Sequence, residues 1–334
     1  MKLKIGIIGA GRIGYRHILA YEKISNAKVI GISDSNSANS EFFTKKFNIK
    51  KFDIDSIHDE KSIDAIHICT PNEFHSKLAI SAMKHGKHVL VEKPMATNLD
   101  DCKKMISIAK KAGVKLMIGH TYRYYPSTLA IKKILELKKI GRPISGLDYL
   151  LTTTKLIPKN KLPIYGNKNR FDNPIIMDSI HLVDKFRFLL NSEIDYIYTS
   201  KIDKIEKSSK VDQIGNITIL FKNNFSLNLL IVGNPGNLFE SDTKIIGEKG
   251  IISAKYGEEV KYGNSNWKGI SFKYKSSPPS FEHNLEGFVN EFKDFLYSIE
   301  NDSEPAVSGL DGMNNLKAVL SMYESYEKRG VVKL

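Results

Sequence analysis

Residues 3–14 read Leu-Lys-Ile-Gly-Ile-Ile-Gly-Ala-Gly-Arg-Ile-Gly, and this stretch decides the fold. Residues 3–8 form a mostly apolar run that is typical of a buried strand, and Gly9, Gly11 and Gly14 follow at once. A helical stretch then runs from about residue 15 to residue 25. A glycine pattern in this strand–turn–helix context predicts a turn that binds the pyrophosphate of a dinucleotide.

Each glycine has its own expected task. Gly9 permits the tight turn, Gly11 lets the pyrophosphate approach bare backbone, and Gly14 lets the helix pack closely on the strand. The N-terminus of the helix offers free N–H groups to the phosphates. The expected phosphate-binding residues are therefore Gly9, Gly11, Arg12, Ile13 and Gly14.

The choice of cofactor depends on Asp34. A second strand-like run, residues 28–33, ends at this residue, twenty positions beyond Gly14. A carboxylate there can bond both hydroxyls of the adenosine ribose and would repel a 2′-phosphate. Residues 35–37 supply no cation beside it, and Arg12 is the nearby guanidinium that could reverse the preference. We expect NAD rather than NADP.

The alternation of strands and helices continues to residue 119. Strand-like residues 64–70, 87–92 and 115–119 are separated by helical stretches at 75–85 and 100–112. Such alternation predicts a parallel sheet with helices on both faces, whose ligands bind beyond the carboxyl ends of the strands. Those ends are Gly9, Asp34, Thr70, Glu92 and Gly119.

From about Arg123 the pattern changes to consecutive strands. They are expected at 146–153, 194–200, 215–221, 226–233, 243–246 and 250–254, and helices at about 285–300 and 312–329 close the chain. Strands without intervening helices imply an antiparallel sheet. We predict an α/β Rossmann domain at 1–122, which binds the dinucleotide. Residues 123–334 should form an α+β domain with a large, open, mostly antiparallel sheet for substrate binding and oligomerisation.

The composition of the chain limits the partners and the compartment that we expect for the protein. The apolar runs are too short to cross a bilayer and no signal-peptide pattern opens the chain. The two cysteines fit a reducing compartment, so we expect a cytoplasmic protein without a membrane partner. The net charge of +13 could attract nucleic acid or a phosphorylated substrate, but the lysines are scattered and no long basic run is interleaved with aromatics. We expect no nucleic-acid partner, while a sugar phosphate or sugar nucleotide stays open.

Several motifs together resemble a known family. They are Thr70-Pro71-Asn72, His75, Gly86-Lys87-His88-Val89, Glu92-Lys93-Pro94, residues 119–124 and Asp178-Ser179-Ile180-His181. Their words and order are similar to those of the Gfo/Idh/MocA oxidoreductases, the glucose–fructose oxidoreductase and inositol dehydrogenase type. The resemblance covers essentially the whole chain. In two respects it departs from many members: residues 173–176 replace a Gly-Gly stretch, and Asp178 and His181 are three rather than four residues apart.

The resemblance implies hydride transfer between NAD(H) and a hydroxyl or keto group of a sugar, cyclitol or sugar nucleotide. It also implies a homodimer or homotetramer, in which a second subunit covers the open sheet. Members of the family often have a cis bond between the residues that match Lys93 and Pro94. The departures leave the substrate open.

Oxidation of an alcohol requires removal of the hydroxyl proton while hydride leaves carbon. Lys93, just past a buried strand, is expected to stabilise the forming alkoxide. His181 is the candidate base, because its unperturbed pKa is near neutrality, and Asp178 would share its helix face and support it or bind substrate. The alternatives are a solvated Lys93, and a capping Asp178 with a packed His181. No further ligand accompanies the Asp178–His181 pair, so no metal is expected.

The remaining candidates surround these three. Cofactor contacts are also expected from Thr70, Pro71, Asn72, His75, Glu92 and Lys93. Substrate contacts are expected from Lys93, Arg123, Tyr124, Arg170, Asp178 and His181. His75 could equally be a packed residue, and Arg170 a surface-loop residue.

Two other functions stay open at this point. An NAD-dependent glycosidase that oxidises its substrate transiently would show no net cofactor turnover. A non-catalytic NAD-binding regulator would need no proton-transfer group, which the combination of Lys93, Asp178 and His181 argues against.

Overall fold

The computed structural model describes residues 2–152, 174–205, 212–233, 239–256, 258–271 and 285–334. The chain divides into two compact units. The first comprises residues 1–121 with 285–316, and the second comprises residues 122–284 with 317–334. In the described ranges, no helix combines the length and the apolar character that a membrane span requires.

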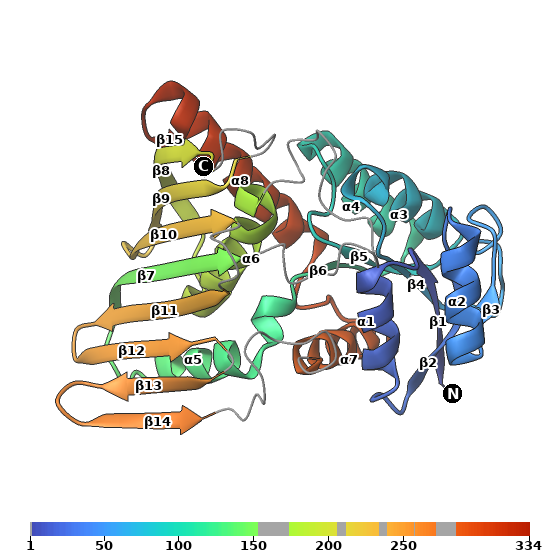
Figure 1. Ribbon diagram of the computed structural model, residues 1–334, viewed down its shortest axis with the longest axis horizontal. Helices are drawn as coiled ribbons and strands as arrows, with labels where there is room; N and C mark the ends of the chain where they lie inside the picture. Colours follow the sequence, from blue (N-terminus) through green and yellow to red (C-terminus); the bar gives the residue numbers. More distant parts are fainter. Residues whose placement is uncertain (1, 153–173, 206–211, 234–238, 257, 272–284) are drawn as a thin grey trace. The chain divides into compact units, whose positions relative to one another are not determined.

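The first unit contains a six-stranded parallel sheet in the order β3-β2-β1-β4-β5-β6 (Figure 1). The strands are β1 (Leu3–Ile8), β2 (Ala27–Ser33), β3 (Lys50–Lys51), β4 (Ala65–Ile68), β5 (His88–Glu92) and β6 (Leu116–Gly119). The connecting helices are α1 (Arg12–Tyr21), α2 (Ser37–Phe47), η1 (Asn72–Phe74), α3 (His75–Lys84) and α4 (Leu99–Ala112). The strand order reverses between β1 and β4, which is where an open α/β sheet forms its ligand crevice. The predicted Rossmann architecture is confirmed.

The division of the chain differs from the two continuous domains expected from sequence. Helix α7 (Glu286–Glu300) and the first residues of α8 (Gly309–Lys328) belong to the first unit. The reason is the apolar face of α7. Phe292 packs its ring 4.9 Å from Tyr21 and 4.7 Å from His17, both on α1, and is fully buried. An amphipathic pattern announces such a face but does not say which sheet or helix it will cover.

The second unit contains a nine-stranded sheet in the order β14-β13-β12-β11-β7-β10-β9-β8-β15 (Figure 1). The strands are β7 (Pro143–Thr152), β8 (Ile194–Asp203), β9 (Ile214–Phe221), β10 (Ser226–Gly233), β11 (Glu240–Gly247), β12 (Gly250–Lys255), β13 (Glu259–Gly263), β14 (Trp267–Ser271) and β15 (Val332–Lys333). Only the β7–β10 pairing is parallel among these described strands, so the mostly antiparallel sheet is confirmed. Sequence reasoning did not anticipate β13, β14 or β15.

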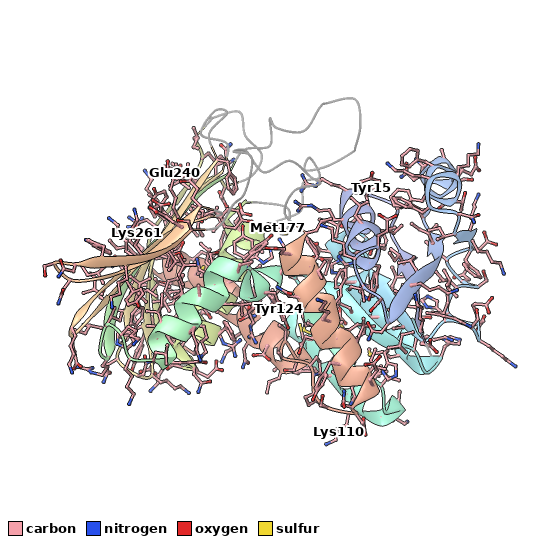
Figure 2. The ribbon with its side chains drawn as sticks, turned by 90° about the horizontal axis from the view of Figure 1, so that it is seen from below. Tyr15, Lys110, Tyr124, Met177, Glu240 and Lys261 are labelled. Atoms are coloured by element: carbon pink, nitrogen blue, oxygen red, sulfur yellow. The ribbon has the colours of Figure 1, made fainter. Side chains whose placement is uncertain are left out.

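Helices cover one face of this sheet. Helix α6 (Pro174–Leu190) packs on β7, β9 and β10, and α5 (Pro126–Glu136) packs on β12 and β13 (Figure 2). The core between them includes Phe186, Ile217 and Ile231, which are fully buried. Side chains alternate between the two faces of a strand, and on the opposite face Leu147 and Tyr198 remain exposed.

Candidate active site

The glycine loop after β1 has the geometry that a dinucleotide requires. Gly9 has φ +109°, and a Cβ there would lie 2.5 Å from the carbonyl oxygen of Cys69. A Cβ at Gly14 would lie 2.1 Å from the carbonyl oxygen of Gly9, so only glycine fits at either position. At Gly11 a Cβ would meet nothing within 4 Å. The loop therefore leaves open space above the N-terminus of α1, which begins at Arg12 and has no side-chain cap.

Asp34 lies beside this loop. Its Oδ2 accepts a hydrogen bond of 2.6 Å from the Ala10 N–H, and its Oδ1 accepts one of 2.7 Å from the Asn36 N–H. Two backbone donors thus fix a carboxylate at the carboxyl end of β2. Each oxygen keeps a lone pair for a ribose hydroxyl. The position fits NAD, whose ribose carries hydroxyls where NADP carries a phosphate.

His75 joins the two loops that follow β4 and β5. Its Nε2 lies 2.8 Å from the Thr70 carbonyl oxygen, and its Nδ1 lies 2.8 Å from the Pro94 carbonyl oxygen. The ring is 1% exposed, and burial lowers the pKa of His75. A neutral ring donates to one of these carbonyls at a time. His75 therefore links the loop after β4 to the loop after β5. These two hydrogen bonds are enough to explain why its ring is buried, and no contact with the cofactor is needed to explain it.

Thr70 and Asn72 stand at the carboxyl end of β4, followed by η1. Within the described part of the chain, the buried Thr70 Oγ1 has no hydrogen-bond partner. A buried hydroxyl without a partner is costly, so it is a candidate donor or acceptor for a bound ligand. Pro71 is exposed and Asn72 is buried. Together with the glycine loop and Asp34, these residues fit a bound NAD.

Glu92 ends β5, and Lys93 follows it. The Lys93–Pro94 bond is cis, as the resemblance implied. The Glu92 carboxylate is turned inward: its Oε1 lies 3.0 Å from His17 Nε2, and a Cβ on Gly119 would lie 3.0 Å from it. Burial alone would raise the pKa of Glu92, but the hydrogen bond with His17 and the nearby positive charge of Lys93 bring it below its usual value.

Helix α6 carries the second group of candidates. Asp178 and His181 are both half-buried on this helix, as expected from their spacing. The hydroxyl of Thr152, at the end of β7, donates a 3.0 Å hydrogen bond to Asp178 Oδ2. The Tyr122 ring stacks on the His181 ring, with centroids 4.5 Å apart and planes 12° apart. Both contacts fix the orientation of a candidate catalytic side chain.

Arg123 and Tyr124 are buried in η2 (Thr121–Tyr124). The Arg123 guanidinium forms a bidentate ion pair with Asp184 on α6, with both N–O distances 2.8 Å. This contact gives Arg123 a structural task that sequence reasoning did not foresee. Tyr124 is 9% exposed (Figure 2). Arg170 lies outside the described residues.

The site residues thus fall into two groups, one in each unit. The first group is the glycine loop, Asp34, the loop after β4 and Lys93. The second is Asp178 and His181. Sequence reasoning missed His17 and Tyr122, which support Glu92 and His181. The available signal was weak, because a polar residue on an amphipathic helix and a tyrosine near a strand end both have many ordinary explanations.

Two family models match the chain. An oxidoreductase family with an NAD-binding Rossmann fold matches residues 3–120, and the C-terminal alpha/beta domain of the same Gfo/Idh/MocA family matches residues 158–334. The chain belongs to the Gfo/Idh/MocA oxidoreductases. It is an enzyme with an NAD-binding domain, as the sequence predicted.

Individual relatives span the chain. A myo-inositol 2-dehydrogenase of Thermotoga maritima is 27% identical, over 99% of this chain and 98% of the relative. A glucose-6-phosphate 3-dehydrogenase of Bacillus subtilis is 29% identical over 68% of this chain and 67% of the relative. Among solved structures, a scyllo-inositol dehydrogenase of Lactobacillus casei with bound NAD(H) and scyllo-inositol has a TM-score of 0.81. It is 23% identical and covers 100% of this chain and 99% of its own, which shows the shared fold.

Proposed function

We propose that this oxidoreductase uses NAD⁺ to oxidise a secondary ring hydroxyl of a cyclitol or cyclic sugar. The observation that carries the proposal is the position of Lys93. It follows β5 directly, at the carboxyl edge of the sheet that also bears the glycine loop and Asp34. His75 ties its loop to the loop after β4. The named relatives act on inositol and on glucose 6-phosphate, which supports a polyhydroxylated ring as substrate.

The proposed mechanism divides the proton chemistry between two side chains. The glycine loop and Asp34 would hold NAD⁺, which would supply a hydride acceptor for the carbinol carbon. The Lys93 ammonium stabilises the forming alkoxide, and His181 accepts the hydroxyl proton. Tyr122 holds the His181 ring by stacking, and Asp178 favours its protonated form. Tyr124 and Arg170 remain proposed substrate contacts, and Arg123 orients α6 through Asp184.

We further propose that a second copy of the chain covers the open face of the nine-stranded sheet. One row across this face consists of Lys244, Leu147, Asn228, Thr218 and Tyr198, each paired in register with the next. Leu147 is 48% exposed and Tyr198 is 43% exposed. Large exposed apolar side chains among polar ones on an open sheet face are typical of a subunit interface. Free Cys69 and Cys102 agree with the proposed cytoplasmic location.

The proposal is tested by supplying NAD⁺ with a panel of inositols, hexoses, hexose phosphates and UDP-sugars. We expect stoichiometric formation of NADH and a ketone from at least one of them. Cleavage of an aryl glycoside without net NADH would instead identify a glycosidase. Binding of NADH without turnover of any member of the panel would favour a regulator.

A further inference from the structure

A chain of buried polar side chains leads from the interior of the first unit to Glu92. His17 and His67 are completely buried, Tyr21 is 3% exposed and Glu92 is 9% exposed. The Tyr21 hydroxyl lies 2.8 Å from His67 Nε2, His67 Nδ1 lies 3.0 Å from His17 Nδ1, and His17 Nε2 lies 3.0 Å from Glu92 Oε1. The proposed cofactor contacts use none of the first three residues.

Aromatic rings enclose this chain. Phe292 of α7 packs against Tyr21, His17 and His67, with ring centroids 4.7–4.9 Å apart. Phe295 lies 5.5 Å from His67, and Phe288 lies 5.5 Å from His17. Helices α1 and α7 lie side by side around it (Figure 1). In so apolar a surrounding, each polar atom needs a partner, so the hydrogen bonds must form a consistent set.

The direction of every hydrogen bond follows from the chemistry of the two ends. An ionised Glu92 can only accept, so His17 Nε2 must carry a proton. Burial lowers the pKa of His67 and raises the pKa of Tyr21, so His67 is neutral and Tyr21 keeps its proton. Among the described residues the Tyr21 O–H has no acceptor other than His67 Nε2, so it donates there. His67 Nδ1–H donates to His17 Nδ1, and His17 Nε2–H donates to Glu92.

We propose that Tyr21, His67 and His17 act as positioning residues that hold Glu92 as an ionised carboxylate beside Lys93. The fixed negative charge stabilises the protonated Lys93, because the attraction between the two charges is mutual. It also favours the cationic oxidised form of the bound nicotinamide over the neutral reduced form. This second consequence rests on the proposed cofactor contact of Glu92, whereas the hydrogen-bond directions do not.

Among the described residues, other ionisable groups also lie around Glu92 and its neighbour Cys69. They are His75 on α3, Lys93 next to Glu92 in the sequence, and Glu291 on α7. Burial raises the pKa of Cys69, with the charges of Glu92 and Glu291 adding to the effect, so its thiol keeps its proton. Its Sγ lies 3.3 Å from His17 Nδ1, where an S–H can donate to the same lone pair as His67.

The first test uses the wild-type protein without cofactor. In a ¹⁵N-histidine NMR experiment at neutral pH, we expect His17 to carry its proton on Nε2 and His67 on Nδ1. Signals are assigned with His17→Phe and His67→Phe. An imidazolium at His17, or the same tautomer at both residues, overturns the proposed directions whatever the enzyme's substrate.

The second test measures the dissociation constants of NAD⁺ and NADH by titration. In His17→Phe, the buried Glu92 loses its donor and takes up a proton, and Glu92→Gln removes the same charge directly. We expect both to lower the preference for NAD⁺ relative to NADH by roughly tenfold, the equivalent of about one pKa unit. Tyr21→Phe keeps the ring and should change the ratio in the same direction, but less.

The control is His85→Asn, a change at an exposed histidine of the same unit, which should leave the ratio unchanged. Equal weakening of NAD⁺ and NADH binding in all three variants would mean that the chain only supports the fold, and the proposal would be abandoned. A shifted ratio in a protein that turns over no polyol would uphold the chain while the proposed function failed.

Discussion

At the scale of single residues, we propose that Lys93 carries the chemistry. Its loop is fixed by the His75 hydrogen bond to Pro94, so a substitution should remove the ammonium without moving the backbone. We expect Lys93→Met to lower kcat by about 10²-fold or more, the scale of losing one positioned electrostatic group. NADH affinity should change little, because the glycine loop and Asp34 hold the phosphates and ribose.

The measurement is steady-state turnover with the substrate found in the panel, together with an NADH fluorescence titration. Lys84→Met, at the exposed end of α3, is the control and should retain full activity. Full turnover by Lys93→Met would refute the proposed mechanism.

We propose that Asp34 sets the choice between NAD and NADP. Its carboxylate is held by two backbone N–H groups, so its charge is fixed where a 2′-phosphate would lie. NADH should bind at least several-fold more tightly than NADPH, and Asp34→Ser should reduce that preference. Fluorescence titrations of the wild type, of Asp34→Ser and of an Asp55→Ser control with NADH and NADPH measure this preference. Equal affinities in the wild type would mean that Arg12 and the lysines outweigh Asp34.

At the scale of elements, α6 and its neighbours prepare His181. The π face of Tyr122 stabilises an imidazolium stacked on it. In Tyr122→Leu the pKa of His181 should fall, so the acidic limb of the pH–rate profile should move to lower pH. Tyr122→Phe keeps the stack and should keep the limb in place. Asp178→Asn should move the limb in the same direction as Tyr122→Leu, and His181→Asn should abolish it. If none of these substitutions moves the acidic limb of the pH–rate profile, that limb reports an ionisable group other than His181.

The ion pair between η2 and α6 assigns Arg123 a structural role, which can be tested by substitution. Arg123 and Asp184 are buried, with side chains 8% and 0% exposed. Arg123→Met leaves a buried carboxylate without its counter-charge and should cost about 3–5 kcal/mol of unfolding free energy. Urea unfolding measures this, and Arg142→Met, which breaks an exposed pair with Glu248, should have little effect. A raised KM with unchanged stability would instead identify Arg123 as a substrate contact.

At the scale of the whole molecule, the open sheet face should determine assembly. Light scattering at micromolar concentration should give at least twice the chain mass of 37.7 kDa. Leu147→Lys puts a positive charge in the exposed row, next to Lys244, and should lower the measured mass. Leu137→Lys alters an exposed leucine at the end of α5 and should not. A wild-type mass near that of one chain would exclude this interface.

The sequence by itself determined the sheet of the first unit and its nucleotide loop. Gly9 and Gly14 allow no side chain at all, and Asp34 stands at a strand end, so local spacing was sufficient. Six of the nine described strands of the second unit, β7 to β12, were also predicted, because their composition marks them individually. The position of Lys93 just past a strand, and of Asp178 and His181 on one helix, followed from the same patterns.

Only the tertiary structure decided which elements pack together. The sequence predicted a helix at about 285–300 but not that Phe292 would cover His17 and Tyr21, so the domain division differed. It showed Glu92 and Arg123 as charged residues near a ligand, but not that His17 and Asp184 would bind them inside the protein. These partners are 75 and 61 residues apart in sequence. Contacts between such distant residues depend on how apolar faces pack, and that packing leaves no local pattern in the sequence.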